Sequence, residues 1–151
     1  MFLAGLGADV LTLDLAPNMA TIAHHQLGLN AVAGSLASLP FGPATLGGAT
    51  ALYCLIHLDD NGLDTAAQDL ARVVAPGGPL LVAFHTGAEI RHLDEWWDGR
   101  VDLDFRFLEA PQVTDRLEHA GFTTEATLVR ASHAKEVDTR RTYVLARRNA
   151  A

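Results

Sequence analysis

The sequence has few cysteines, few positive charges and no long apolar segments, and each shortage excludes a class of protein. A single cysteine, Cys54, cannot form an internal disulfide, which suits a reducing cytoplasm. The net charge is −7, because 18 acidic residues outnumber 11 lysines and arginines. This balance disfavours nonspecific binding to nucleic acid or to an anionic membrane. No apolar run is long enough to span a bilayer, so we expect a cytoplasmic protein without nucleic-acid or membrane partners.

The composition is that of one globular domain. Hydrophobic residues make up 49% of the 151 residues, enough to bury a sizeable core. The first residues have neither a basic region nor a long apolar stretch, so they do not form a signal peptide. The histidines lack the spacing of metal ligands and we predict no metal site. Without a repeat or linker, we predict a single domain over residues 1–151.

The most informative stretch is an apolar run over residues 10–13 that ends on Asp14, before Pro17 opens a helix. Continuous hydrophobicity is typical of a parallel strand covered on both faces, so we expect a buried strand. Asp14 then lies at the carboxyl end of that strand, where ligands of open α/β sheets bind. A carboxylate there can accept two hydrogen bonds from a ribose diol, or it can cap the next helix.

Strand-like and helical runs alternate along the chain, which indicates an α/β fold with a largely parallel sheet and helices on both faces. After a helix tail over residues 1–6, we expect strands over 10–13, 31–33, 49–56 and 80–84, and helices over 17–27, 62–74 and 111–120. Residues 86–108 break the pattern as an insertion over one end of the sheet. Two closing runs, 122–129 and 142–146, predict a final antiparallel pair.

Apolar residues at helical spacing predict the buried face of each helix. In the helices over 17–27, 62–74 and 111–120 they are, in turn, Met19, Ile22, Ala23 and Leu27; Leu63, Ala66, Ala67, Leu70 and Val74; and Val113, Leu117 and Ala120.

Short stretches in a fixed order carry a family resemblance. They are Gly7–Val10 with Leu13–Met19, Gly34–Leu36 with Leu39–Phe41, Leu55–Leu58, Arg72–Leu81 and Leu117–Phe122. Each is weak alone, but together they resemble the class I S-adenosylmethionine-dependent methyltransferases over nearly the whole chain. The resemblance implies a Rossmann-like fold, S-adenosylmethionine as cofactor, and methyl transfer to a small-molecule acceptor.

The resemblance also implies where the cofactor binds. Asp14 would hold the ribose diol, and Leu15 and Met19 would flank the adenosine. Ser35 and Leu36 lie where the family usually reads the adenine amino group. Because Ser35 is shorter than the acidic or amide residue common there, adenine recognition would rest on the Leu36 backbone. A loop serine without that role is the alternative.

The strand ends supply the candidate catalytic residues. The resemblance implies that Tyr53 contacts the cofactor. Tyr53 and His57 would both lie at the end of the strand that faces the methyl group. His57 and His85 come at the ends of neighbouring strands, so we expect both at one pocket. Imidazole titrates near neutrality, so either could position or deprotonate an acceptor. Either could equally be a polar residue that covers the sheet edge.

The insertion at 86–108 usually forms part of the acceptor pocket in this family. His92, Trp96 and Trp97 are therefore the expected substrate contacts. One tryptophan could line the pocket and stack on a flat substrate. The alternative, for at least one of the two, is a side chain that only covers the sheet.

One part of the family's pattern is missing. Members begin with a strand and a glycine-rich loop, and Gly5 and Gly7 cannot be that loop. Asp14 follows Gly5 by only nine residues, whereas a loop, a helix and a second strand need roughly 20. We therefore expect an N-terminally truncated domain whose first family strand is absent and whose cofactor binding is weak or lost.

The missing strand is central in the family's sheet, between the strand ending at Asp14 and the one beginning near Ala49. Its loss would leave backbone groups unpaired, at roughly 1–3 kcal/mol each. The two strands could pair directly, or a second copy could pair with them in a homodimer, or the natural protein could be longer. Two other functions stay open: a catalytically silent binding or oligomerisation module, and a nicotinamide-dependent enzyme, which the lack of a GxGxxG loop disfavours.

Overall fold

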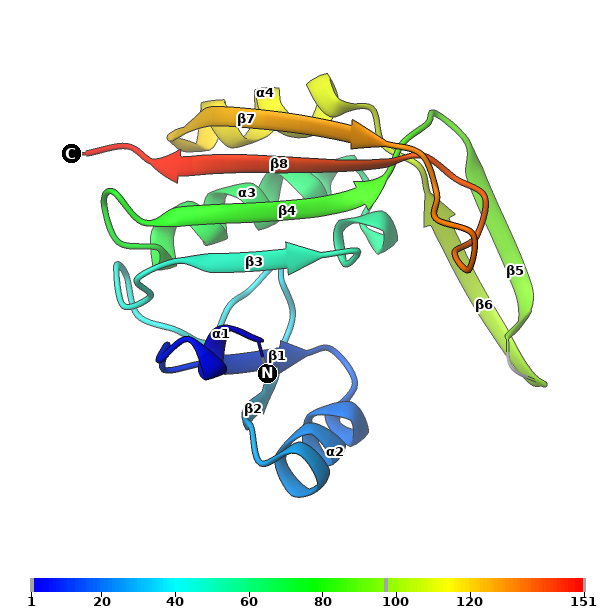
Figure 1. The fold of residues 1–151 in the computed structure, drawn as a ribbon, viewed down its shortest axis with the longest axis horizontal. Helices are drawn as coiled ribbons and strands as arrows, with labels where there is room; N and C mark the ends of the chain where they lie inside the picture. The colour runs from blue at the N-terminus through cyan, green and yellow to red at the C-terminus, as the bar shows by residue number, and fades with distance from the viewer. Residues whose placement is uncertain (1, 97, 151) are drawn as a thin grey trace. The chain divides into compact units, whose positions relative to one another are not determined.

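The computed structural model describes residues 2–96 and 98–150, and the chain divides into two compact units, Met1–Pro40 and Phe41–Ala151. Both units combine helices with strands, as the α/β prediction requires (Figure 1). Among the described residues, no helix is long and apolar enough to cross a membrane.

The first unit is built on two short parallel strands. Its elements are α1 (Phe2–Gly5), β1 (Leu11–Asp14), α2 (Pro17–Leu27) and β2 (Asn30–Ala33). In the register of the pair, Leu11 lies opposite Asn30 and Asp14 opposite Ala33. Gly28 ends α2 in the left-handed region at φ +64°, which glycine adopts without the steric cost of a side chain. The predicted bounds of this helix are confirmed.

The predicted burial of the first unit is wrong. In α2 only Ala20 is buried, while Met19, Ile22 and Leu27 are 50%, 40% and 51% exposed. Leu11 of the supposedly buried strand is also exposed. A two-stranded sheet with one four-residue helix and α2 has too little surface to bury its strands or α2.

The second unit contains a four-stranded sheet in the order β3-β4-β8-β7 and a separate β5–β6 hairpin. Its elements are β3 (Ala49–Leu52), the 3₁₀ helix η1 (Leu55–His57), α3 (Asp60–Val73), β4 (Pro79–His85), β5 (Ile90–Trp96), β6 (Gly99–Arg106), α4 (Ala110–Ala120), β7 (Phe122–Arg130) and β8 (Arg141–Arg148). β3 and β4 are parallel, and β8 is antiparallel to both β4 and β7. The predicted closing antiparallel pair is confirmed, and the predicted insertion is the hairpin.

Strand β3 is shorter than predicted. It ends at Leu52 rather than at residue 56, because Tyr53 takes a positive φ of 58° and Leu55–His57 turn into a 3₁₀ helix. β1 and β3 each lie at an edge of their own sheet, so they do not pair with each other.

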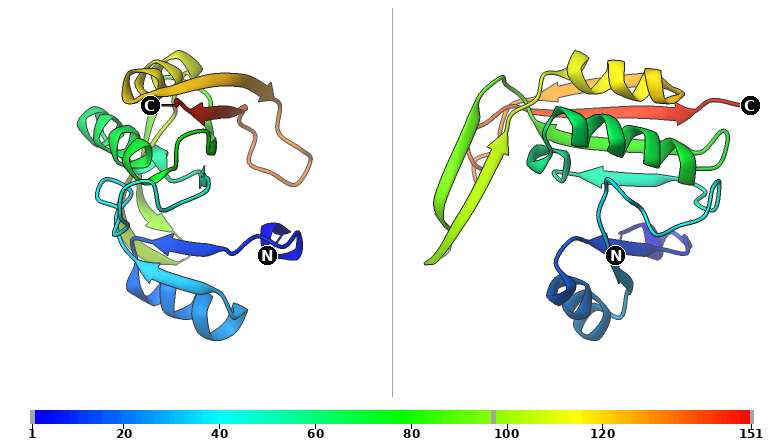
Figure 2. Two further views of the ribbon diagram at one scale, coloured as in Figure 1. Left: turned by 90° about the vertical axis from the view of Figure 1, so that its left-hand side faces the viewer. Right: turned by 180° about the vertical axis from the view of Figure 1, so that it is seen from behind.

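The core lies between one face of the four-stranded sheet and the two helices α3 and α4 (Figure 2). Strand residues alternate between faces, so Leu80, Val82 and Phe84 point to this side and have no exposed surface. The predicted inner face of α3 is confirmed, with Val74 buried just beyond the helix end. In α4, Val113 and Leu117 are buried but Ala120 is only half-buried.

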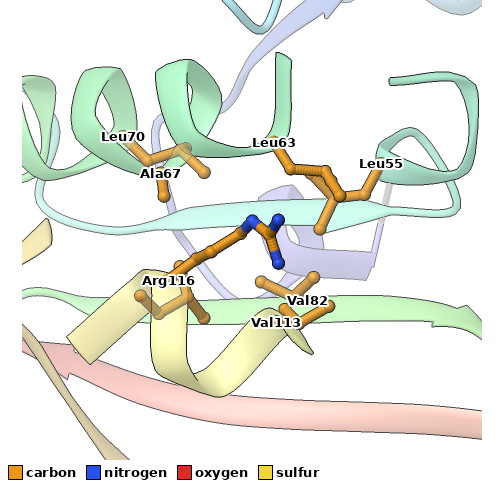
Figure 3. Close-up of a pocket in the computed structure, with 8 residues that line it drawn as sticks. Leu55, Leu63, Ala67, Leu70, Val82, Val113 and Arg116 are labelled. Atoms are coloured by element: carbon orange, nitrogen blue, oxygen red, sulfur yellow. The ribbon is translucent and has the colours of Figure 1, made fainter. Parts of the chain in front are cut away.

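A small void lies between α3, α4 and β4. Its volume is about 10 Å³, and Figure 3 shows it lined by aliphatic side chains and by Arg116. This is space for about one water molecule. Arg116 pairs with Asp60 and Asp64 of α3 at 3.0 and 2.8 Å. The void is therefore a packing defect of the core, too small to hold a cofactor.

The core assignment predicts unequal costs for two truncations. Phe84→Ala should lower the free energy of unfolding by about 3–5 kcal/mol, because a fully buried ring leaves a cavity. Leu128→Ala, on a side chain that is 60% exposed, should change it by less than about 1 kcal/mol. Denaturant unfolding followed by circular dichroism measures both. Equal losses would contradict the assigned core.

Candidate functional site

Asp14 ends β1 with its side chain exposed. Its Oδ1 accepts a hydrogen bond from the Ala16 N–H at 2.8 Å, so the carboxylate does brace the turn into α2. No further hydrogen bond to it is found within the described part of the chain, which leaves Oδ2 available to a ligand. Leu15 and Met19 beside it are exposed by 76% and 50%.

The loop after β2 reaches the same end of the first unit. The Gly34 N–H donates to the Asp14 carbonyl at 2.9 Å, which extends the pairing of β1 and β2 by one step. Ser35 and Leu36 follow at once and are half-buried. The Ser35 Oγ accepts from the Ala37 N–H at 3.2 Å, so its own proton remains available. The structure therefore brings Asp14, Leu15 and Ser35 to one strand end.

A second group of aromatic and charged side chains lies at one end of the four-stranded sheet. His85 ends β4, and Tyr53 follows β3, which runs parallel to it. Tyr143 of β8 is opposite Ala83, and Arg130 of β7 is opposite the start of β8. The antiparallel register thus carries two residues from the closing strands to the carboxyl ends of β3 and β4 (Figure 1).

Tyr53 and Tyr143, here called the tyrosine pair, are joined through their hydroxyl groups. The two Oη atoms are 3.1 Å apart. Arg130 donates from Nη2 to the Tyr143 Oη at 2.9 Å, and its guanidinium pairs with both oxygens of Glu136 at 2.7 and 2.8 Å. Such a two-bond Arg–carboxylate pair fixes the guanidinium plane, so the hydroxyl of Tyr143 is held from one side.

The backbone of Tyr53 is strained. Its φ of +58° lies in the left-handed region, which costs a non-glycine residue about 1–2 kcal/mol. The Tyr53 N–H still donates to the Ala83 carbonyl at 2.7 Å, so the sheet ladder holds the residue in place. Strain of this kind gathers at functional sites.

The pKa values at this end of the sheet are displaced from their ordinary values. Burial raises the pKa of Tyr53, and the hydrogen bond with Tyr143 raises it further. The pKa of Tyr143 is lowered by the Tyr53 hydroxyl and by Arg130, since both hydrogen bonds favour its phenolate. Arg130 also holds the pKa of Glu136 at about 2.

The pKa of His85 lies below the ordinary value of a histidine, which favours the neutral imidazole. Burial lowers its pKa first, and the charges of Arg141 and Arg91 lower it further. Its Nδ1 is 2.8 Å from the Thr139 Oγ1, which leaves Nε2 for another partner. The ring centroid is 5.1 Å from that of Tyr53 and 5.7 Å from that of Phe107. The structure therefore brings two of the expected site residues, Tyr53 and His85, into contact.

His57 faces the hairpin instead. Its ring packs against Phe105 with centroids 4.8 Å apart, and Trp96 stacks on the same phenyl ring at 4.7 Å. The Nδ1 of His57 is 3.4 Å from the Asp104 carbonyl. The structure thus joins His57 to Trp96 through one phenylalanine, while Trp97 lies outside the described residues.

His92 lies among carboxylates on the exposed side of the hairpin. Its two ring nitrogens are 2.9 Å from Asp104 and 3.1 Å from Asp94, and these hydrogen bonds raise its pKa. Within the described ranges, no group of three or more side chains has the geometry of a metal site.

Sequence reasoning missed Tyr143 and Arg130. Neither belongs to a motif, and Tyr143 is 90 positions away from its hydrogen-bond partner. The predicted closing antiparallel pair could have indicated them. In such a pair, the end of the first strand and the start of the second lie near the carboxyl ends of the parallel strands.

The tyrosine pair predicts a split titration, which is readable because the chain has only two tyrosines. The ultraviolet absorbance of tyrosinate should rise in one step below pH 10 and one above. Tyr53→Phe should remove the upper step and move the lower one toward pH 10, because Tyr143 loses a donor. Two coincident steps near pH 10 would contradict the pairing.

Comparison with known proteins places the chain in a family. A family model described as a methyltransferase domain matches residues 1–78, more than half of the sequence. No curated protein sequence gives a significant match.

Solved structures share the fold at low identity. An S-adenosylmethionine-dependent methyltransferase of Methanosarcina mazei is 14% identical with a TM-score of 0.86, over 99% of this chain and 86% of that one. The 1,6-didemethyltoxoflavin-N1-methyltransferase of Burkholderia thailandensis is 20% identical with a TM-score of 0.74, over 99% and 65%. The glycopeptide N-methyltransferase MtfA is 17% identical with a TM-score of 0.71, over 95% and 79%. These likenesses extend the Rossmann-like fold to the whole chain, and by the family match the chain belongs to the methyltransferase domain family.

Proposed function

We propose that this chain is an S-adenosylmethionine-dependent methyltransferase domain that acts on a small-molecule acceptor. The observation that carries the proposal is the exposed carboxylate of Asp14 at the end of β1, within the segment that matches the family. One of its oxygens braces the turn into α2, and the other is available to a diol. The Burkholderia relative was solved with S-adenosylhomocysteine, which supports this class of cofactor.

The first unit suits the nucleoside part of the cofactor. Asp14 would accept hydrogen bonds from the ribose hydroxyls, while the exposed side chains of Leu15 and Met19 would cover the adenosine. Ser35 and the Leu36 backbone would read the edge of the adenine. No glycine-rich loop precedes Asp14 in this sequence, so the methionine part would have fewer contacts. We therefore propose weak binding, supported mainly by the nucleoside.

The second unit suits the acceptor. The bound cofactor supplies the methyl group, and the protein aligns the acceptor and handles its proton. His85 is the better placed of the two candidate bases, because its imidazole is neutral and its Nε2 is available. His57 would position the acceptor beside Trp96. We propose His92 and Trp97 as further acceptor contacts. Tyr53, just after the end of β3, is the proposed cofactor contact among these residues.

A calorimetric titration with S-adenosylhomocysteine tests the cofactor assignment. The wild-type chain should bind measurably but more weakly than micromolar. Asp14→Asn should weaken binding by about tenfold, because one charged acceptor is lost. The amide oxygen can still accept from the Ala16 N–H, so the turn is retained. Asp9→Asn, an exposed neighbour ahead of β1, is the matched control.

Two results would count against the assignment. Micromolar affinity in the wild-type chain would contradict the weak binding. An equal effect of Asp14→Asn and Asp9→Asn would remove Asp14 from the ribose site.

A second candidate function is oligomerisation without catalysis. It is favoured by the edge positions of β1 and β3, because an unpaired strand edge is a template for another chain. A homodimer formed through these edges would satisfy backbone groups that have no partner strand within the described residues.

Sedimentation tests this candidate. Velocity runs over a range of concentrations should show a dimer whose population grows with concentration. A monomer at every concentration would exclude pairing through these strands, whatever the outcome of the cofactor titration.

A further inference from the structure

We propose that Arg130 and the tyrosine pair form a chain of hydrogen-bond donors that binds an ionised oxygen of an aromatic methyl acceptor. This inference rests on the proposed function, since it names the acceptor class for the strand ends that carry His85. It is argued entirely from residues of the second unit.

The direction of the chain follows from what each group can do. A guanidinium has donors and no acceptor, so Arg130 must donate to the Tyr143 Oη. Without a ligand, Tyr53 donates to Tyr143, in line with the pKa directions of the two phenols. Either hydroxyl can be the donor across the 3.1 Å between the two Oη atoms. An anion beside Tyr53 therefore reverses the pair, so that Tyr143 donates to Tyr53. This leaves the proton of Tyr53 for a ligand. Successive hydrogen bonds polarise one another, so the last hydroxyl is a stronger donor than an isolated phenol.

The chain is held before any ligand arrives. Glu136 takes two hydrogen bonds from Arg130 and one from the His133 N–H at 2.8 Å. Arg141 is buried and donates to the carbonyls of Val137 and Thr139, which fixes the loop between β7 and β8. Ligand binding therefore requires little further loss of conformational entropy in these side chains.

The local charge favours an anion. Two arginines, Arg130 and Arg141, share one carboxylate, that of Glu136. Arg130 pairs with it at 2.7 Å and Arg141 lies 3.4 Å from it. Positive charge also acts on the imidazole of His85. Burial lowers the pKa of His85 most, and the charges of Arg141 and Arg91 lower it further. A phenol is protonated at neutral pH, as a donor must be, and burial raises the pKa of Tyr53 further. An ionised oxygen would meet a net positive region despite the acidic chain.

The neighbouring rings indicate a flat aromatic ligand. Tyr53, His85 and Phe107 are in ring contact, with centroids 5.1 and 5.7 Å apart. Arg91 lies 4.5 Å above the centre of the Phe107 ring, and its guanidinium pairs with Glu89 at 2.6 Å. An aromatic ring fits such surroundings through offset or edge-on contacts. The Nε2 of His85 is then left for the nucleophilic atom beside the ionised oxygen.

The experiment compares benzoate with benzamide, a neutral amide of the same shape, by calorimetry on the full chain without cofactor. Benzoate should bind at least about tenfold more tightly, which is the usual effect of a hydrogen bond to a charged group. Tyr53→Phe should abolish this preference and leave benzamide affinity unchanged. Tyr143→Phe should reduce the preference, because Arg130 no longer polarises Tyr53. Both variants keep the aromatic ring, and circular dichroism verifies their fold.

Glu125→Gln is the matched control. Glu125 pairs with Arg147 near the opposite end of the same sheet, so its loss should leave the preference for benzoate unchanged. Benzoate that binds no better than benzamide, including no detectable binding of either, would overturn the proposal. So would a preference that survives Tyr53→Phe. Because no cofactor is present, these results are independent of whether S-adenosylhomocysteine binds.

Discussion

Strand β4 is paired on both sides, and the rest of the second unit depends on that pairing. β3 runs parallel to it and β8 antiparallel, so every backbone group along the strand can be bonded within the sheet. One face of β4 is fully buried under α3 and α4. A strand with both edges paired and one face covered cannot shift its register without exposing that core. The positions of all residues at its carboxyl end follow from this constraint.

The sheet has both parallel and antiparallel strands, and these directions decide which side chains lie together at the carboxyl end of β4. A parallel neighbour brings the residue after β3 to the end of β4, and an antiparallel neighbour brings residues from the start of β8. The result is a neutral imidazole, two phenols and a guanidinium clamped by one carboxylate. In water an ion pair of this kind is worth little, but next to partly buried phenols it changes their acidity. The local strain at Tyr53 is retained because the ladder bond to Ala83 opposes its release.

The first unit follows different physics. Its two strands and the helices α1 and α2 leave most apolar side chains exposed, so its own burial contributes little stability. A ligand that covers Leu15 and Met19 would bury apolar area and stabilise the unit through mass action. The bounds of α2 could be predicted because local signals set them. Its buried face could not, because most of the apolar side chains on that face are exposed.

The sequence by itself determined the order of the elements outside the hairpin and the 3₁₀ helix, the bounds of α2 and the inner face of α3, because local propensity, caps and helical spacing encode these. It also pointed to Asp14 and His85, since a residue at the end of an apolar run lies at the end of a strand. Only the tertiary structure decided that β3 stops at Tyr53, because a positive φ in a tyrosine has no signature in composition. Only the tertiary structure joined Tyr53 to Tyr143, since strand register, a non-local property, brings together residues 90 positions apart. Burial is non-local in the same way: Met19 and Ile22 have helical spacing, yet they remain 50% and 40% exposed.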